Sequence, residues 1–584
     1  MDSEGNKNWY EVIQSFFVSV DNKRVRSRTS TDTQRHTTDT LNERDEYDPE
    51  ATMQLRIMTF NVWYGGDQVN IEDTARAIVE CGADIVGIQE PDANLYAIAE
   101  LAGMPYVDDR RYIISRFPLF NSGRGMRTAH GSGEYSISGL DPDCIHAWVL
   151  VKPDRMIAFS NTHLPSDPYG PDFVVAGKTA DEIVKLEEEI RGDDVNALVS
   201  GLEPLVRENI PLFVTGDFNT PSHLDYTPET VGSQPQIQFP IEWPITKKME
   251  DAGLQDSYRL VNPSPTALPG ITHTPGQPAP VPVTNELMDR IDFIWTTPCI
   301  EVVSCEVVDD LPSISSDNAR IDDHLKSDTP YTWPSDHSAV VATVRLTPIE
   351  AVPMIAVTRR RVMIGEDINV YLSVPVGDSW SVVLVLAHRP ASEAITGLYN
   401  EKLSYRRKIR FGSYTLSPGE YEAVLLSSKS EGEGEELARV VFAVVAPHVV
   451  PRLWVHTPVV PLNGEVILCW EHTPGNRMDW VAIYEASNVD LGGFIGNFYT
   501  GAKFSGKFSV SLKDSKVFSK QLPTVGEYKA ILLRNDEFVA LAETRFTVVS
   551  SMKEIVVDKE SSTAINSVSN ISMFPKNSIN SHHG

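Results

Sequence analysis

Cysteine is scarce in this chain. The 584 residues include only five cysteines, which are scattered and show neither CxxC pairing nor the spacing of a zinc finger. This pattern argues against a disulfide-stapled or cysteine-ligated fold, so we expect reduced thiols. Cys299 and Cys305 are near enough in sequence to pair in an oxidising compartment.

Long apolar runs are missing as well. No stretch of about 18 apolar residues occurs, so no transmembrane segment is expected. An apolar patch over 12–20 is interrupted by Gln14 and Ser15 and is followed by basic residues, the reverse of the charge order in a secretory signal. We therefore expect a cytoplasmic protein.

Basic residues are outnumbered by acidic ones, 51 to 80, which gives a formal net charge of -29 at pH 7. A surface of this charge repels polyanions, so bulk attraction to nucleic acid is excluded. A nuclease is not excluded, because a bound divalent cation inverts the field at its own site. The length and the 41% hydrophobic composition predict three or four soluble domains.

The region 53–348 alternates apolar strands with helical patterns. Apolar density predicts strands at 55–63, 84–90, 111–115, 147–151, 156–163, 211–217, 290–296 and 338–346. Helical periodicity predicts a helix over 71–81 that stops at Gly82, and helix over 178–209 with a break near Gly192. Strand, helix, strand order is typical of α/β architecture. The Pro-rich segment 262–283 is too long for a passive connector and is expected to face the substrate.

The composition changes on both sides of this region. Polar residues dominate 1–52 and 551–584, which we expect to be disordered tails. From about 350 onward, β-branched and aromatic residues with Gly and Pro punctuation predict all-β structure. The pattern Gly365-Glu366, Trp380 and 419–426 is echoed by Gly464-Glu465, Trp480 and 526–533. This repeat predicts two immunoglobulin-like β-sandwiches, 351–447 and 449–549.

Polar side chains gather where the predicted strands of 53–348 end. In PLFVTGDFNTP, residues 211–221, strand alternation places Asp217 and Asn219 on one side and turns Phe218 inward. Each of these residues alone also fits an ordinary turn or a hydrogen-bonded core position. The further polar residues at strand ends or starts are Asn61, Glu90, His163, Asp292, Asp336 and His337. Their number favours a single site at one edge of a sheet.

The chemistry of this set points to a hard metal ion. Carboxylate and amide oxygens suit Mg²⁺ or Mn²⁺ and are poor ligands for Zn²⁺. Two histidines beside such an ion, one of them oriented by a carboxylate, can deprotonate water and polarise a phosphate. We therefore expect hydrolysis of a phosphoester by in-line attack. No nucleophilic Ser or Cys motif accompanies the set, which disfavours a covalent intermediate.

The motifs FNVW, GIQE, NTHL, TGDFN, DRIDFIW and SDHSAV, in this order over 55–347, resemble those of the endonuclease/exonuclease/phosphatase superfamily, the deoxyribonuclease-like phosphoesterases. The resemblance implies an α/β (α+β) four-layer sandwich, with two sheets face to face and helices outside. It also implies single-step hydrolysis with inversion at phosphorus.

The resemblance further implies a role for each motif residue. Glu90 would be the main metal ligand, Asn61 a supporting ligand or phosphate contact, and Asp336 would lie near the metal. Asp217 and Asn219 would position the attacking water and the phosphoryl oxygens. His337, held by Asp292, would be the general base or would polarise the phosphate. His163 would donate to the phosphate or the leaving group, and its own partner is expected between 105 and 146, with Tyr112 and Glu134 as candidates.

The substrate stays open at this point. The tryptophan and arginine that flank GD in inositol polyphosphate 5-phosphatases are absent, and no basic face typical of abasic-site nucleases is evident. A non-specific nuclease acting on nucleic acid and a sphingomyelinase- or phosphoinositide-phosphatase-like enzyme acting on a phospholipid head group both remain. A silent binding scaffold is the non-enzymatic alternative. MDWVAIY at 478–484 faintly resembles SKICH-type sandwiches, so the sandwiches are expected to dock a protein or membrane surface, although Trp480 also fits plain core.

Overall fold

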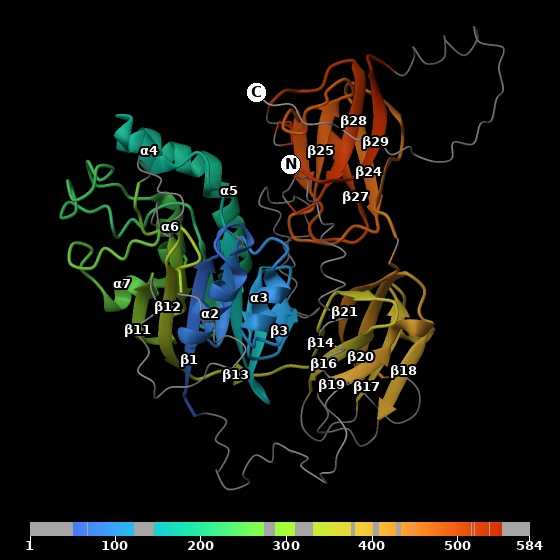
Figure 1. The fold of residues 1–584 in the computed structure, drawn as a ribbon, viewed down its shortest axis with the longest axis horizontal. Helices are drawn as coiled ribbons and strands as arrows, with labels where there is room; N and C mark the ends of the chain where they lie inside the picture. Colours follow the sequence, from blue (N-terminus) through green and yellow to red (C-terminus); the bar gives the residue numbers. More distant parts are fainter. Residues whose placement is uncertain are drawn as a thin grey trace, which may run out of the picture. The chain divides into compact units, whose positions relative to one another are not determined.

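The computed structural model describes most of the chain between the two expected tails (Figure 1). The described residues are 51–66, 68–121, 145–273, 287–309, 331–374, 380–400, 408–427, 434–447, 449–515, 517–518, 520–535 and 538–551. The predicted tails 1–52 and 551–584 thus fall almost entirely outside the described residues.

Two β-sheets form the centre of the region 53–350. The first has the order β11-β12-β1-β2-β4-β3, and the second has the order β5-β6-β7-β8-β10-β9 with β13 beside β7. The β1–β2 and β7–β8 pairs are parallel and the other pairs are antiparallel. The strands of the first sheet are β1 (Met53–Asn61), β2 (Ile85–Gln89), β3 (Tyr106–Asp108), β4 (Ile113–Ser115), β11 (Glu301–Val308) and β12 (Ala339–Leu346). Those of the second are β5 (Leu119–Asn121), β6 (Ala147–Lys152), β7 (Arg155–His163), β8 (Leu212–Asp217), β9 (Gln255–Asp256), β10 (Asp292–Thr296) and β13 (Ile349–Glu350).

Three separate apolar cores show that these elements stack as four layers. Alternate residues of β1 face opposite ways: Ile57 joins the core between the two sheets, whereas Met58 joins the core under the helices. The helices α2 (Ile71–Glu80) and α3 (Leu95–Leu101) cover the first sheet, and α5 (Ala180–Arg207) and α6 (Pro244–Asp251) cover the second. This is the four-layer α/β sandwich that the motifs implied.

Helix α5 corrects one prediction, because it runs unbroken for 28 residues through Gly192. The apparent break came from polar residues in the buried stripe. Glu187 and Arg191 are both fully buried and form an ion pair at 2.9 Å, so the helix keeps one inward face through this stretch. A glycine costs about 1 kcal/mol in a helix interior relative to alanine, which the burial of this face outweighs. The short helices η1 (Tyr64–Gly66), α4 (Gly170–Val175) and α7 (Ser257–Val261) were not predicted.

The β-rich part consists of two sandwiches with the same strand order. Each has a three-stranded sheet, β14-β16-β19 or β22-β24-β27, facing a five-stranded sheet, β15-β21-β20-β17-β18 or β23-β29-β28-β25-β26. The strands are β14 (Met354–Val357), β15 (Arg361–Met363), β16 (Asp367–Ser373), β17 (Trp380–Leu386), β18 (Thr396–Asn400), β19 (Lys408–Gly412), β20 (Gly419–Ser427) and β21 (Glu436–Val445), then β22 (Arg452–Val455), β23 (Val459–Pro461), β24 (Glu465–Glu471), β25 (Trp480–Glu485), β26 (Gly496–Tyr499), β27 (Gly506–Ser511), β28 (Gly526–Leu533) and β29 (Ala540–Val549).

The sequence repeat reflects equivalent core positions in the two sandwiches. Trp380 and Trp480 open equivalent strands and are both buried, but Trp380 joins the core between the two sheets, whereas Trp480 joins a separate apolar cluster with Ala482 and Tyr484 on the other face of its sheet. The hydroxyls of Tyr421 and Tyr528 each donate to the carbonyl four residues earlier, at 2.7 and 2.9 Å. A tyrosine that bonds back to its own approach loop closes many immunoglobulin-like sandwiches.

Two further predictions concern the cysteines and the length of apolar helices. Cys81, Cys299, Cys305 and Cys469 are free thiols, so Cys299 and Cys305 are not paired, and Cys144 lies outside the described residues. Within the described part of the chain, each helix is too short or too polar to cross a bilayer.

A buried polar network joins the two sheets of the four-layer sandwich. Asn161 of β7 accepts hydrogen bonds from Gln89 at 2.7 Å and from Thr215 at 3.0 Å. Its amide donates to the carbonyls of Ile88 and Arg111, both at 2.9 Å. Because every one of these groups is buried, the network fixes the height of β2 relative to β7 and β8.

We predict that Asn161→Leu loosens this connection. Removing the amide leaves several buried polar groups unsatisfied, which costs about 3 kcal/mol of stability. Hydrogen–deuterium exchange of the full chain should therefore show faster exchange in β7 and β2. Strand β24 of the second sandwich serves as the internal control and should be unchanged, and unaltered protection of β7 would contradict the role given to Asn161.

Candidate active site

The register of the strands brings the predicted residues together. The parallel pairing of β7 and β8 places His163 beside Asp217, and the antiparallel pairing of β8 and β10 places Asp217 beside Asp292. In the first sheet Asn61 pairs with Gln89, so Glu90 follows directly at the same edge. The polar residues at the strand ends of both sheets thus lie at one edge of the sandwich.

Asn61 connects the two sheets at this edge. It is buried, and its amide donates to Glu90 Oε1 at 3.1 Å and to Asp217 Oδ2 at 3.0 Å. Glu90 has a positive φ of 54°, which turns its carboxylate back over the strand end, where Oε2 accepts from the Tyr64 amide at 3.0 Å. Both carboxylate oxygens of Glu90 are therefore held in place, with lone pairs left over for a cation.

Asp217 is the most heavily used acceptor of the site. Its side chain is 1% exposed, and Oδ1 accepts from the Asn219 amide at 2.9 Å. Oδ2 lies 3.5 Å from His163 Nε2 and 3.8 Å from His337 Nε2. Burial alone would raise the pKa of Asp217, but the two imidazoles outweigh burial and lower it. Phe218 is buried between Asp217 and Asn219, which confirms the predicted alternation.

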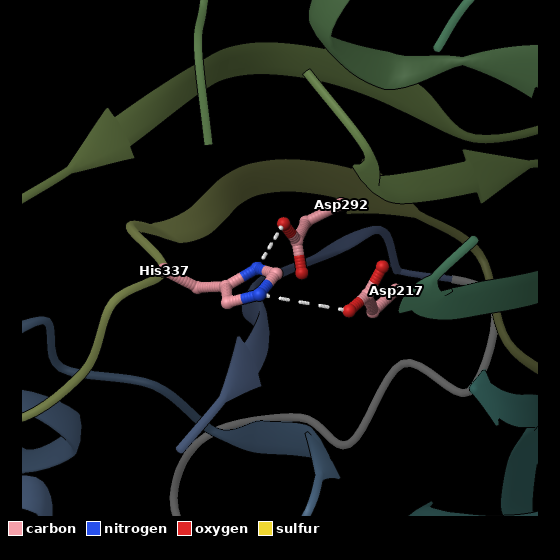
Figure 2. Close-up of side chains that lie close together, drawn as sticks. All are labelled: Asp217, Asp292 and His337. Atoms are coloured by element: carbon pink, nitrogen blue, oxygen red, sulfur yellow. Dashed lines mark hydrogen bonds and ion pairs between the residues drawn. The ribbon is translucent and has the colours of Figure 1, made fainter. Parts of the chain in front are cut away.

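His337 is held by Asp292, as Figure 2 shows, through an Nδ1 to Oδ2 contact of 2.9 Å. Burial would lower the pKa of His337, but the carboxylates of Asp292 and Asp217 outweigh burial and raise it to about 10. The imidazole is then protonated at neutral pH. Of its two expected roles, this charge state favours polarising the phosphate over acting as the base.

Both histidines of the site are drawn toward the charged form. Burial works against the charge on His163, but its hydrogen bond to Asp217 and the charges of Asp217 and Glu90 raise its pKa. The side chain of His163 is 29% exposed, so it can reach a ligand. His337 and His163 thus both turn their Nε2 atoms toward Oδ2 of Asp217, at 3.8 and 3.5 Å.

The acidic mouth of the site fits a hard divalent cation. Burial, together with the charges of Glu90 and Asp217, raises the pKa of Asp336 to about 6 despite the nearby His337. Such crowding of carboxylates is relieved by a bound Mg²⁺ or Mn²⁺. A tighter group, Asp217, Asp292 and His337, also has its ligand atoms within 4.8 Å of one another. All three residues of that group are buried, and each offers one carboxylate or imidazole ligand atom.

A cleft of about 510 Å³ opens over these residues, and several of its lining side chains were not predicted. They are Trp63, Tyr64, Tyr169 and His273. The His273 ring lies against the His337 ring, with centroids 5.0 Å apart, and burial and the His337 charge lower its pKa to about 4. His273 belongs to the Pro-rich segment 262–283, so its position agrees with the prediction that this segment faces the substrate. Residues 274–283 lie outside the described residues.

Among the described residues, the candidate partner Tyr112 is not placed beside His163 in the cleft. Tyr112 does not line the cleft, and its carbonyl instead accepts from the Asn161 amide at 3.2 Å beneath the site. Glu134 lies outside the described residues. The acidic neighbours of His163 are Asp217 and Glu90, at 3.5 and 3.9 Å. Sequence order could not reveal these two neighbours, because Asp217 ends β8, which lies beside β7, and Glu90 follows β2 of the other sheet.

We predict that Asp292→Asn lowers the pKa of His337 from about 10 toward the ordinary value of about 6.5. The sign follows from the loss of the carboxylate that stabilises the imidazolium. NMR titration of labelled histidine side chains measures the change. Asp181→Asn, at an exposed position in the first turn of α5, is the control and should leave the His337 titration unaltered. An unchanged titration in Asp292→Asn would show that Asp292 does not set the charge of His337.

Comparison with known proteins places this geometry in a family. A model of the endonuclease/exonuclease/phosphatase family matches residues 58–337, which include every residue of the site. An uncharacterised protein of Caenorhabditis elegans, F14F9.5, is 30% identical over 312 residues, which cover 49% of this chain and 90% of the relative. A crystal structure of chicken CNTN1 FN1-FN3 domains matches 37% of this chain and 80% of that one, at 10% identity and a TM-score of 0.13. The family model and the relative agree with the four-layer fold and its motifs, and the chain belongs to the endonuclease/exonuclease/phosphatase family.

Proposed function

We propose that this chain is a Mg²⁺- or Mn²⁺-dependent hydrolase that cleaves a phosphoester in a single in-line step. The observation that carries the proposal is the crowding at Asp217 Oδ2, which meets Asn61, His163 and His337 within 3.8 Å. An acceptor flanked by two cationic donors and an amide is suited to an anionic centre that a water molecule attacks.

Glu90, Asn61 and Asp336 would hold the metal ion. Their oxygens are hard ligands, and the raised pKa of Asp336 marks a place where negative charge is in excess. When bound, the ion would neutralise phosphate charge and polarise the phosphorus–oxygen bonds. Glu90 is positioned for this by the backbone of Tyr64 and the amide of Asn61.

The remaining residues supply proton and water positioning. Asp217 and Asn219 orient the attacking water, since their strand end and left-handed turn hold both side chains at the floor of the cleft. His337, kept protonated by Asp292, donates to a phosphoryl oxygen. His163 donates to the phosphate or to the leaving oxygen. This division gives the attacking and leaving sides separate donors, as in-line displacement requires.

The set is complete, which supports an enzyme over a silent scaffold. The proposed ligands, base and donors come together at one edge of the two sheets, where each has at least one charged or polar neighbour. A scaffold that only binds would have no need of an ionised His337–Asp292 pair beside a buried carboxylate. For the cell, we propose a cytoplasmic enzyme whose two sandwiches dock it to a protein or membrane surface.

We predict that Asp217→Ala lowers kcat on a generic nitrophenyl phosphodiester by ~10²-fold or more, because the water and both imidazoles lose their common partner. The release of nitrophenol at saturating Mg²⁺ measures the effect, and circular dichroism confirms that the variant is folded. Asp181→Ala on the exposed face of α5 should keep the wild-type rate. A folded Asp217→Ala with near-normal turnover would remove Asp217 from the mechanism.

We predict that Glu90→Gln weakens Mn²⁺ binding by about tenfold or more, because an amide replaces the central carboxylate ligand. Electron paramagnetic resonance of free Mn²⁺ gives the affinity without reference to turnover. Glu229→Gln, at an exposed position, is the matched control and should bind Mn²⁺ as the wild type does. Equal affinities in the two variants would rule out Glu90 as a ligand.

A further inference from the structure

One wall of the cleft is an aromatic turn that is fixed to the catalytic edge. Trp63, Tyr64, Gly65 and Gly66 all have positive φ, at 55°, 46°, 78° and 73°. Two successive non-glycine residues in this region are strained, and such strain is found mainly at functional sites. The turn persists because catalytic residues hold it: the Trp63 amide donates to Asn61 Oδ1 at 3.0 Å and the Tyr64 amide to Glu90 Oε2 at 3.0 Å.

The result of this turn is an exposed aromatic ring beside the predicted metal ligands. Tyr64 is 61% exposed, although a tyrosine in a folded domain normally buries its ring. It lines the cleft together with Glu90, Asp336 and Asp167. Tyr64 therefore stands between the catalytic carboxylates and the opposite wall.

The opposite wall, residues 165–172, is equally well supported. The buried Arg191 of α5 donates to the carbonyls of Pro165, Ser166 and Pro168 at 2.8, 2.8 and 3.2 Å. Its remaining charge is neutralised by Glu187. The Tyr169 hydroxyl donates to Asp289 at 2.8 Å, which fixes the ring at the cleft.

Two carboxylates at this wall have no catalytic partner. Asp167 and Asp172 line the cleft, are exposed, and lie near enough that Asp167, together with burial, raises the pKa of Asp172. Among the described residues that line the cleft, none is lysine or arginine. Among the described residues around Asp217, the groups that can carry a positive charge are thus imidazoles, and those of His163 and His337 already contact Asp217 or Asp292.

This lining discriminates between classes of phosphoester. A nucleic acid or a polyphosphorylated inositol carries further phosphates next to the scissile one, and these would meet Asp167 and Asp172 with no basic side chain among the described lining residues. An ammonium group would instead be attracted by those carboxylates and by the faces of Trp63, Tyr64 and Tyr169. Aromatic rings with nearby carboxylates are the usual surroundings of bound alkylammonium groups.

We infer that the substrate is a phosphodiester in which one ester arm carries an ammonium group of the choline or ethanolamine kind. The ammonium lies between the aromatic turn and the 165–172 wall, while the phosphate lies over Asp217. The inference rests on the proposed function and adds the substrate class to it. In the reaction, a water oxygen bonds to phosphorus, the bond from phosphorus to the other arm breaks, and that arm leaves as an alcohol after taking a proton.

The test compares two diesters that differ by one atom. In 4-nitrophenyl phosphorylcholine and 4-nitrophenyl 3,3-dimethylbutyl phosphate, the second replaces the quaternary nitrogen by carbon, so size and leaving group are matched. We expect the full chain with Mg²⁺ to hydrolyse the choline ester with a kcat/KM about tenfold or more higher. Equal values, or a preference for the neutral ester, overturn the inference and leave the proposed function standing.

Single-residue variants then test which side chains of the cleft discriminate between the two esters. Tyr64→Ala should bring the ratio of the two kcat/KM values close to one, and Tyr64→Phe should preserve the ratio. Asp167→Asn should lower the ratio as well. If Asp167→Asn instead raises the Mg²⁺ requirement equally for both esters, the wall binds a second metal ion and the inference is wrong.

A binding measurement tests the inference if neither ester is turned over. If neither ester is hydrolysed, the proposed function fails, and calorimetric titration of the chain with phosphorylcholine and with 3,3-dimethylbutyl phosphate decides the inference by itself. Tighter binding of phosphorylcholine, lost in Tyr64→Ala, supports an ammonium site. Equal binding of the two phosphates overturns it.

Discussion

The hydrogen bonds and ion pairs made by one buried carboxylate, that of Asp217, tie the active site together. Asn61 reaches this carboxylate from the first sheet, His163 from the neighbouring strand and His337 from the start of β12. A buried carboxylate without partners would be neutralised by protonation, so the charge of Asp217 depends on these donors, and their positions depend on its charge. The site is therefore a mutually dependent unit, in which removing the central acceptor disturbs every donor.

This unit requires the two sheets to end at the same height. The Asn161 network supplies that constraint one layer below, since the Gln89 amide of the first sheet donates to Asn161 of the second, which also accepts from Thr215 of the neighbouring strand. At the edge of the sheets the buried Ser335 hydroxyl donates to the Asn61 carbonyl at 2.6 Å and so anchors the segment that carries Asp336 and His337. Polar contacts thus set the alignment that the apolar core between the sheets, being non-directional, leaves free.

The sequence predicted the parts of the site that strand periodicity controls. Asp217 and Phe218 point to opposite sides as expected because a strand end imposes a period of two, whereas Asn219 reaches the cleft from a left-handed turn with a φ of 50°. The sequence did not predict that α5 is unbroken. Glu187 and Arg191 form a buried ion pair on its inward face, and charged residues at such positions interrupt the hydrophobic pattern. Tyr64, Tyr169 and His273 were not predicted as cleft residues, because the conformation of loops places them there. A left-handed turn such as that at Tyr64 leaves no periodic pattern in the sequence.

The strongly acidic composition and the lining of the cleft both disfavour polyanionic substrates. A phosphoesterase for polyanions needs basic side chains to offset repulsion, and the excess of acidic residues in this chain works against such substrates. The site itself concentrates its positive charge in imidazoles that are already committed to Asp217 and Asp292. A substrate that brings its own cation removes the conflict, since its ammonium offsets the carboxylates at 167 and 172 while its phosphate meets the protonated histidines. Such a diester is a zwitterion without net charge, so the acidic surface that repels nucleic acid would not repel this substrate.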